Sequence, residues 1–158
     1  LNMYFSKKEV KMINFLVCQF DQTLKENYKD ADLSNSYSAF FSRLRKAETV
    51  NEFVELLNFI CENKEVMLKN LNRESFLKIW NKSTINGNLS ININGEFINF
   101  LNGIADNNPI VKEYYNMITI AGDISPSAIS YLVDKQGELE LDPHIRFILT
   151  VHYLSICK

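Results

Sequence analysis

The chain has little of the residue types on which most recognisable chemical sites depend. Its five glycines stand singly and form neither a GxGxxG loop nor a GxxxxGKS or GxxxxGKT phosphate loop. Its two histidines, His144 and His152, are two helical turns apart, and the chain contains no HxxxH, HExxH or CxxC metal motif. No serine stands in a GxSxG nucleophile elbow. We therefore expect a protein that is not an enzyme and that binds no metal or cofactor.

Cysteine is also sparse. Cys18, Cys61 and Cys157 are an odd number at wide spacing, which does not resemble the framework of a disulfide-rich secreted domain. Each cysteine lies in an apolar helical context, so we interpret all three as reduced core residues in a reducing compartment. The stretch 1–5 is followed at once by charged residues and does not resemble a secretory signal. These observations predict a cytoplasmic protein.

A strong charge of one sign and long apolar runs are missing as well. The net charge is −2 and the isoelectric point is about 5.7; this disfavours nucleic acid as a partner, because nucleic-acid binders usually carry a basic footprint. The longest apolar stretch, 145–157, is interrupted by Arg146 and His152, and a membrane-spanning helix needs ~20 apolar residues. The length fits one domain over residues 1–158, and we expect it to have no contact with a membrane.

The first half of the chain contains several helix start signals. Ser6 with Glu9, and Thr49 with Glu52, have the spacing of capping boxes, and each is followed by apolar residues at helical spacing. Asn72 is a third candidate cap. Together with an apolar stripe over 37–44, these patterns predict four helices within residues 6–82.

The last third of the chain repeats such signals with proline in the first helical position. Asn108-Pro109, Ser125-Pro126 and Asp142-Pro143 predict three helix starts, and Gly122 predicts the end of the first of these helices. The helix after Asp142 is apolar on nearly every side, which is typical of a central buried helix or one that meets a partner. Residues 138–142 alternate between acidic and apolar, which suits a short strand or an extended linker. Residues 109–158 are therefore predicted to be helical again.

The region 83–108 contains three Asn-Gly pairs, at 86, 94 and 102, and Asn-Gly is a strong turn signal. With Asn94-Gly95 as a two-residue turn, Leu89 would face Phe100 in a β-hairpin over 89–101, and only Phe97 would fall on the wrong side. The alternative is a helix from Glu96 to Ala105. We favour the hairpin and predict a mainly α fold, a bundle of six or seven helices with one small β-hairpin near residues 89–101.

Adjacent aromatic residues suggest a surface for a protein partner. Phe40-Phe41 and Tyr114-Tyr115 each place two rings about 100° apart on a helix, so we expect one ring of each pair near the surface. Tyr and Phe are enriched at interface cores. We therefore expect a non-catalytic protein-interaction or regulatory module that acts through an exposed aromatic and aliphatic helix surface. Its partner is another protein, and a homo-oligomer is an alternative.

A DNA-binding regulator of the winged-helix or helix-turn-helix type is the alternative function, and it would use residues 111–142. A helix, a glycine turn and a second helix that begins with Ser-Pro have the order of that motif. The second helix would present Ser127, Ser130, Tyr131 and Lys135 to a groove of DNA. The acidic residues of 138–142 count against it, because they come directly after the DNA-reading helix, at the place where the phosphates of DNA would lie.

One basic cluster, Arg43, Arg45 and Lys46, could bind a small anion or an acidic partner. Acidic residues lie beside it in the sequence, and exposed helix faces commonly carry such mixed charges. The ordinary interpretation of this cluster is therefore a solvated helix face.

Overall fold

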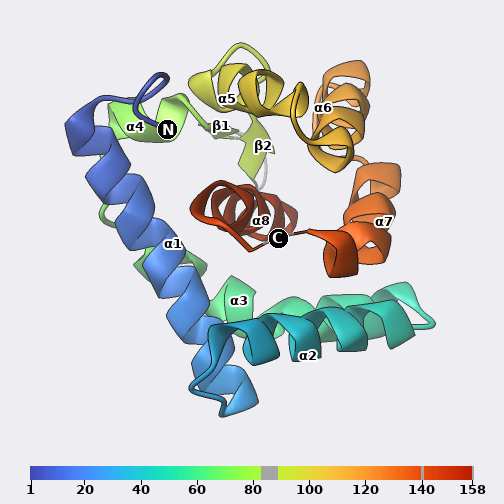
Figure 1. Cartoon of the computed structure of the whole chain (residues 1–158). Coiled ribbons are helices and arrows are strands. Elements are labelled where there is room, and N and C mark those ends of the chain that lie inside the picture. Colours follow the sequence, from blue (N-terminus) through green and yellow to red (C-terminus); the bar gives the residue numbers. More distant parts are fainter. Residues whose placement is uncertain (83–88, 140, 158) are drawn as a thin grey trace.

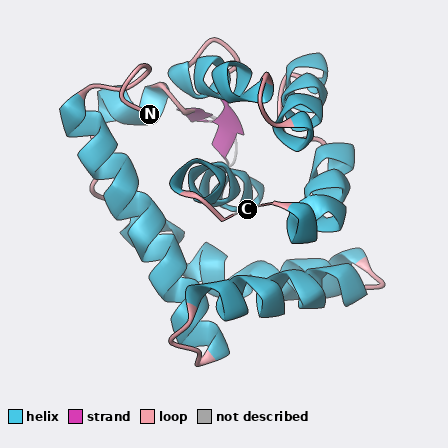
Figure 2. Ribbon diagram, viewed as in Figure 1, coloured by secondary structure: helices cyan, strands magenta, loops and turns pink. Residues whose placement is uncertain are grey.

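Eight α-helices, one 3-10 helix and two short β-strands form the part of the chain that the structure describes. This computed structural model describes residues 1–82, 89–139 and 141–157. In chain order the elements are α1 (Lys7–Tyr28), α2 (Leu33–Lys46), α3 (Val50–Leu68), α4 (Arg73–Leu77), β1 (Trp80–Lys82), β2 (Leu89–Ile91), α5 (Glu96–Ala105), α6 (Pro109–Ala121), α7 (Pro126–Lys135), η1 (Gln136–Glu138) and α8 (Pro143–Ile156). The prediction of a mainly helical fold with one small β-hairpin is confirmed, although the described residues form eight α-helices where six or seven were predicted (Figure 2).

The last helix, α8, lies at the centre of the fold, and the other elements surround it (Figure 1). Every residue from Phe147 to Leu154 is buried, as the all-round apolar pattern predicts. Aromatic rings make much of this packing. The ring of Phe147 lies 5.4–6.0 Å from three other phenylalanine rings, and Tyr153 lies 4.8 Å from Phe40 between ring centroids. Because α8 contacts α1, α3 and β2, its burial joins segments that are far apart in the sequence.

The predicted helix caps form, with one difference in detail. The Ser6 hydroxyl accepts a hydrogen bond from the Glu9 amide, and the Glu9 carboxylate accepts one from the Ser6 amide at 2.7 Å. At the start of α3 the Thr49 hydroxyl accepts from the Glu52 amide, but the Glu52 carboxylate accepts from the amide of Glu48 instead of that of Thr49. The second capping box is therefore only half formed, while the N-terminus of the helix is still capped.

The predicted hairpin turn at Asn94-Gly95 is wrong. Strand β2 pairs with β1, with Trp80 opposite Ile91, and residues 96–105 form α5, which was the alternative prediction. A two-residue hairpin turn of the Asn-Gly type requires positive φ, whereas φ of Gly95 is −87°. Glycine is needed there for a different reason, because a Cβ at this position would lie 2.4 Å from the carbonyl oxygen of Lys78. The Asn86-Gly87 pair lies outside the described residues.

The segment after α7 also differs from its prediction. Residues 136–138 form the 3-10 helix η1, and the described residues of 138–142 form no strand; Glu140 lies outside the described residues. The expected alternation in burial is present at the described positions, since Leu139 is buried whereas Glu138 and Asp142 are exposed. Leu139 is therefore buried and Leu141 partly buried without the predicted strand.

The prediction that all three cysteines are reduced is wrong for two of them. Cys61 in α3 and Cys157 after α8 form a disulfide, with their Cα atoms 5.1 Å apart. Cys18 is free, as predicted, but it is exposed and not a core residue. Sequence spacing gave no sign of the pairing, because the two cysteines are 96 positions apart and meet only when α8 packs against α3. The Lys64 ammonium donates a hydrogen bond to the carbonyl oxygen of Cys157, which further ties the C-terminal end of α8 to α3.

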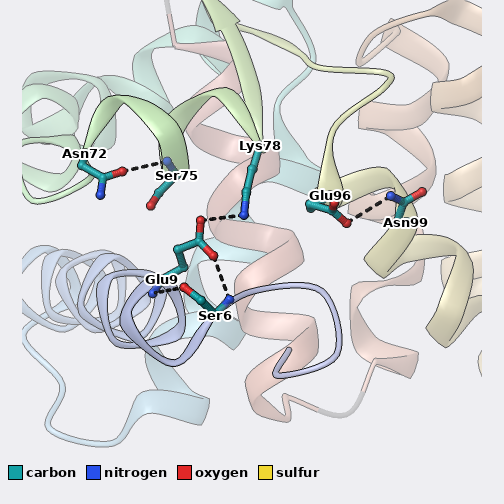
Figure 3. A network of polar contacts seen from close by, with 7 residues as sticks. All are labelled: Ser6, Glu9, Asn72, Ser75, Lys78, Glu96 and Asn99. Atoms are coloured by element: carbon teal, nitrogen blue, oxygen red, sulfur yellow. Dashed lines mark hydrogen bonds and ion pairs between the residues drawn. The ribbon is translucent and has the colours of Figure 1, made fainter.

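A polar network joins the N-terminus of α1 to the segment between α4 and β1 (Figure 3). The Lys78 ammonium lies 2.8 Å from the Glu9 carboxylate, whose side chain is only 7% exposed. Burial alone would raise the pKa of Glu9, but hydrogen bonds from Lys78 and Ser6 outweigh burial and lower that pKa. The network therefore holds Glu9 ionised. Across residues 1–82, 89–139 and 141–157, the structure has no helix with the length and apolar character that crossing a membrane requires.

Candidate docking groove

The four aromatic residues expected at a partner surface lie mostly in the core. Phe40, Phe41 and Tyr114 are buried, and Tyr115 is partly buried. The expectation of one exposed ring is therefore wrong for Phe40-Phe41, whereas in the other pair Tyr115 is the more exposed ring. The two pairs lie on α2 and α6, at different sides of the fold, so the structure does not bring them together (Figure 1).

The residues of the alternative DNA-reading helix are accessible. Ser127 and Ser130 are exposed on α7, and Tyr131 and Lys135 are partly exposed. The Lys135 ammonium, however, lies 2.8 Å from the carboxylate of Glu138 and forms an ion pair with it. The cation at this helix therefore already has an anionic partner within the chain.

A hollow in the described part of the structure lies between α2 on one side and Gly137, Leu139 and Leu141 on the other. It measures about 600 Å³ and is partly open to solvent. The residues that line it are Ser34, Tyr37, Ser38, Phe41, Ser42, Arg45, Lys46, Gly137, Leu139 and Leu141. We call this hollow the α2 groove.

The spacing of residues along α2 explains how the groove is built. Ser34, Ser38 and Ser42 recur every four residues, so they form one small and polar stripe along the helix. Tyr37 and Phe41 lie one position before Ser38 and Ser42, and both rings are buried against the core. The serines leave space that larger side chains would fill, and the aromatic rings with Leu139 and Leu141 supply the apolar floor.

The charged residues among the described lining of the groove are both cations. Arg45 and Lys46 lie in the last turn of α2, and neither has an ion-pair partner among the described residues. Arg43, in the same turn, differs because its guanidinium lies 5.1 Å from the centre of the Tyr28 ring. The groove therefore combines an apolar floor with one positively charged end.

A buried polar network supports the floor of the groove. The Tyr37 hydroxyl donates to the Asp21 carboxylate at 2.8 Å, and the Arg146 guanidinium donates to the other oxygen of Asp21 at 2.5 Å. Burial raises the pKa of Asp21, whereas Tyr37 and Arg146 act in the opposite direction. The network connects α1, α2 and α8 and fixes the position of the Tyr37 ring.

We expect the substitution Tyr37→Phe to lower the free energy of unfolding by about 1.5–2 kcal/mol, because it removes a buried hydrogen bond to a charged group. Urea titration measures this change. Tyr115→Phe is the control, since Tyr115 is partly exposed, and it should change stability by no more than about 0.5 kcal/mol. Equal effects of the two substitutions would contradict the role of the Tyr37–Asp21 bond.

A second, smaller hollow of about 330 Å³ lies beside Asn107, Asn108, Asp142 and His144. The Asp142 carboxylate already accepts hydrogen bonds from the amides of His144 and Ile145 as the cap of α8. In the described ranges, no group of three or more His, Cys, Asp or Glu side chains is arranged to hold a metal ion. The carboxylate in this hollow is therefore already used as a helix cap, so we regard the hollow as a weaker candidate for a binding site than the α2 groove.

Of the four predicted aromatic residues, only Phe41 lines the α2 groove; sequence reasoning missed the serine stripe and the two leucines. The four-residue serine spacing beside the basic cluster was a visible signal for one wall. The opposite wall had no signal, because it depends on where Gly137, Leu139 and Leu141 lie relative to α2, which no local pattern indicates. Comparisons of the chain with protein-family models, curated proteins and solved structures gave no match.

Proposed function

We propose that this domain is a non-catalytic protein-interaction or regulatory module and that its partner docks in the α2 groove. The observation that carries the proposal is the groove itself, about 600 Å³, with an apolar floor and two cations that lack ion-pair partners among the described residues. Interfaces between proteins commonly combine an apolar centre with a polar rim. The α2 groove has a similar arrangement, with the buried residues Tyr37, Phe41 and Leu139 in its floor and two cations at one end.

DNA binding through α7 is the second candidate. The exposure of Ser127 and Ser130 favours it, because both side chains are available to a partner. The ion pair between Lys135 and Glu138 counts against it, and so does the absence of a strand among the described residues of 138–142. We rank it below docking in the α2 groove.

The Cys61–Cys157 disulfide bears on where the domain works. The expectation of a cytoplasmic location rested on reduced cysteines. Because Cys61 and Cys157 form a disulfide, these two cysteines no longer support that location. Disulfides persist mainly in oxidising compartments. We therefore propose that the domain meets its partner where this disulfide stays formed.

Two matched variants test the proposed function. Ser38→Trp places a large side chain in the α2 groove, and Ser127→Trp makes the same change at an exposed position on α7. Tagged wild type and both variants are used to capture partners from a lysate of the source cells, with nuclease added to half of each sample. Captured protein is identified by mass spectrometry, and nucleic acid is detected by staining.

We expect a defined protein that persists after nuclease, is lost with Ser38→Trp and is retained with Ser127→Trp. Binding of that purified protein should then weaken at least about tenfold with Ser38→Trp, because a tryptophan occupies the space of the ligand. Capture that Ser38→Trp leaves unchanged would show that the partner does not use the groove. Recovery of nucleic acid that depends on Ser127 would favour the second candidate.

A further inference from the structure

We infer that the partner binds the α2 groove through a short extended segment that carries an aliphatic side chain and, at one end, acidic side chains. This inference rests on the proposed function and names the chemistry of the partner. It depends on three properties of the groove: its length, its apolar floor and the charge at one end.

The length of the groove fits a segment of five or six residues. Ser34 and Lys46 mark its ends along α2, and a helix rises ~1.5 Å per residue, so they are about 18 Å apart along the helix axis. An extended chain advances ~3.3 Å per residue. A short linear segment is therefore long enough to follow the groove from end to end.

The floor of the groove fits an aliphatic side chain. Phe41 on α2 faces the same hollow as Leu139 and Leu141 from the opposite wall. Phe41 and Leu139 are themselves buried, and Leu141 is partly buried, so the floor is already formed without a ligand. A leucine or valine of the partner would cover these three residues.

The charged end of the groove fits carboxylates. Arg45 lies near the opposite wall, because a Cβ added to Gly137 would be 3.5 Å from one of its terminal guanidinium nitrogens. Guanidinium groups bind carboxylates through two parallel hydrogen bonds. The neighbouring Glu138 carboxylate is paired with Lys135 and does not pair with Arg45. Arg45 and Lys46 thus have no ion-pair partner among the described residues, and an acidic side chain of the partner would form an ion pair with them.

Fluorescence anisotropy with defined probes tests this inference on the full chain. The probes are labelled hexapeptides with two leucines toward one end and two glutamates toward the other, in both orders. Matched hexapeptides carry glutamine or lysine in place of glutamate, and a labelled DNA duplex serves as a polyanion without aliphatic side chains. The protein variants are Arg45→Glu with Lys46→Glu, and Lys7→Glu with Lys8→Glu as a control of equal charge change on α1.

The inference predicts that one of the glutamate hexapeptides binds wild type and the control variant alike. Its dissociation constant should rise about tenfold or more with Arg45→Glu and Lys46→Glu, and the lysine hexapeptide should bind at least tenfold more weakly than the glutamate one. Circular dichroism checks that both variants are folded. The Phe41→Leu variant gives a second readout, since it alters the floor without changing charge and should weaken the same peptide.

Several results would overturn the inference. Neither glutamate hexapeptide binds, or the lysine hexapeptide binds as tightly as the glutamate one. Alternatively, the variant with Lys7→Glu and Lys8→Glu loses binding, or the DNA duplex is the one probe that binds. If the captured protein is still lost with Ser38→Trp in such a case, the docking function stands and only the acidic chemistry is wrong. If Ser38→Trp has no effect either, the proposed function fails as well.

Discussion

Loss of the Cys61–Cys157 disulfide should lower the free energy of unfolding by about 4–5 kcal/mol. The disulfide closes a loop with a sequence separation of 96 residues, and in the chain-entropy account a cross-link over a loop near 100 residues stabilises by about 4.7 kcal/mol. It also ties the end of the central helix α8 to α3. A change of this size is comparable with the whole stability of many single domains.

Urea titration with and without reductant measures the effect, and the double variant Cys61→Ser with Cys157→Ser reproduces it without reductant. Cys18→Ser is the control, because Cys18 is exposed and free. Alkylation of the unfolded chain should label one thiol before reduction and three after it. Three labelled thiols before reduction, or unchanged stability in the double variant, would contradict the pairing.

Acidification should destabilise the domain through His152. This side chain is fully buried, its Nδ1 lies 2.9 Å from the Tyr114 hydroxyl, and its Nε2 has no partner among the described residues. Burial lowers the pKa of His152 from 6.5 to about 3. The folded protein therefore keeps the imidazole neutral at a pH where the unfolded chain protonates it.

The sign and size of the effect follow from proton linkage. Between pH 6.5 and about 3 the unfolded chain binds one proton more than the folded protein at His152, so stability falls as the pH falls. Each pH unit well below 6.5 costs about 1.4 kcal/mol, but at pH 6.5 itself the unfolded imidazole is only half protonated. Lowering the pH from 6.5 to 4.5 should therefore cost about 2.3 kcal/mol.

Urea titrations at several pH values, on wild type and on His152→Gln, test this prediction. The glutamine amide can still bond with the Tyr114 hydroxyl but does not titrate. The stability of wild type should therefore fall by about 2.3 kcal/mol more than that of the variant between pH 6.5 and 4.5. Parallel pH profiles of the two proteins would show that His152 does not titrate as its burial implies.

Local signals in the sequence predicted the helices well, because caps and apolar stripes act within a few residues. Ser6, Asn108 and Gly122 cap their helices as their residue types predict. The hairpin was mispredicted at the point where a local signal competes with a distant contact. Glycine is required at position 95 because the backbone of Lys78 lies too close for a Cβ atom. Phe97, which would have faced the wrong side of the predicted hairpin, is buried in α5.

The groove and the disulfide were beyond local reasoning for a related physical reason. The pairing of Cys61 with Cys157 depends on the packing of α8 against α3, and the groove depends on Leu139 and α2 lining the same hollow. No short-range pattern in the sequence indicates those contacts. What it did indicate was the basic end of α2, with Arg45 and Lys46, although a solvated helix face was the ordinary interpretation.

Hydrogen–deuterium exchange on the full chain, with and without its captured and purified partner protein, tests the docking claim most directly. If the partner binds in the α2 groove, amides of residues 34–46 and 137–141 should become protected, while α7 changes little. Protection confined to residues 126–135, or no change over 34–46, would contradict the account.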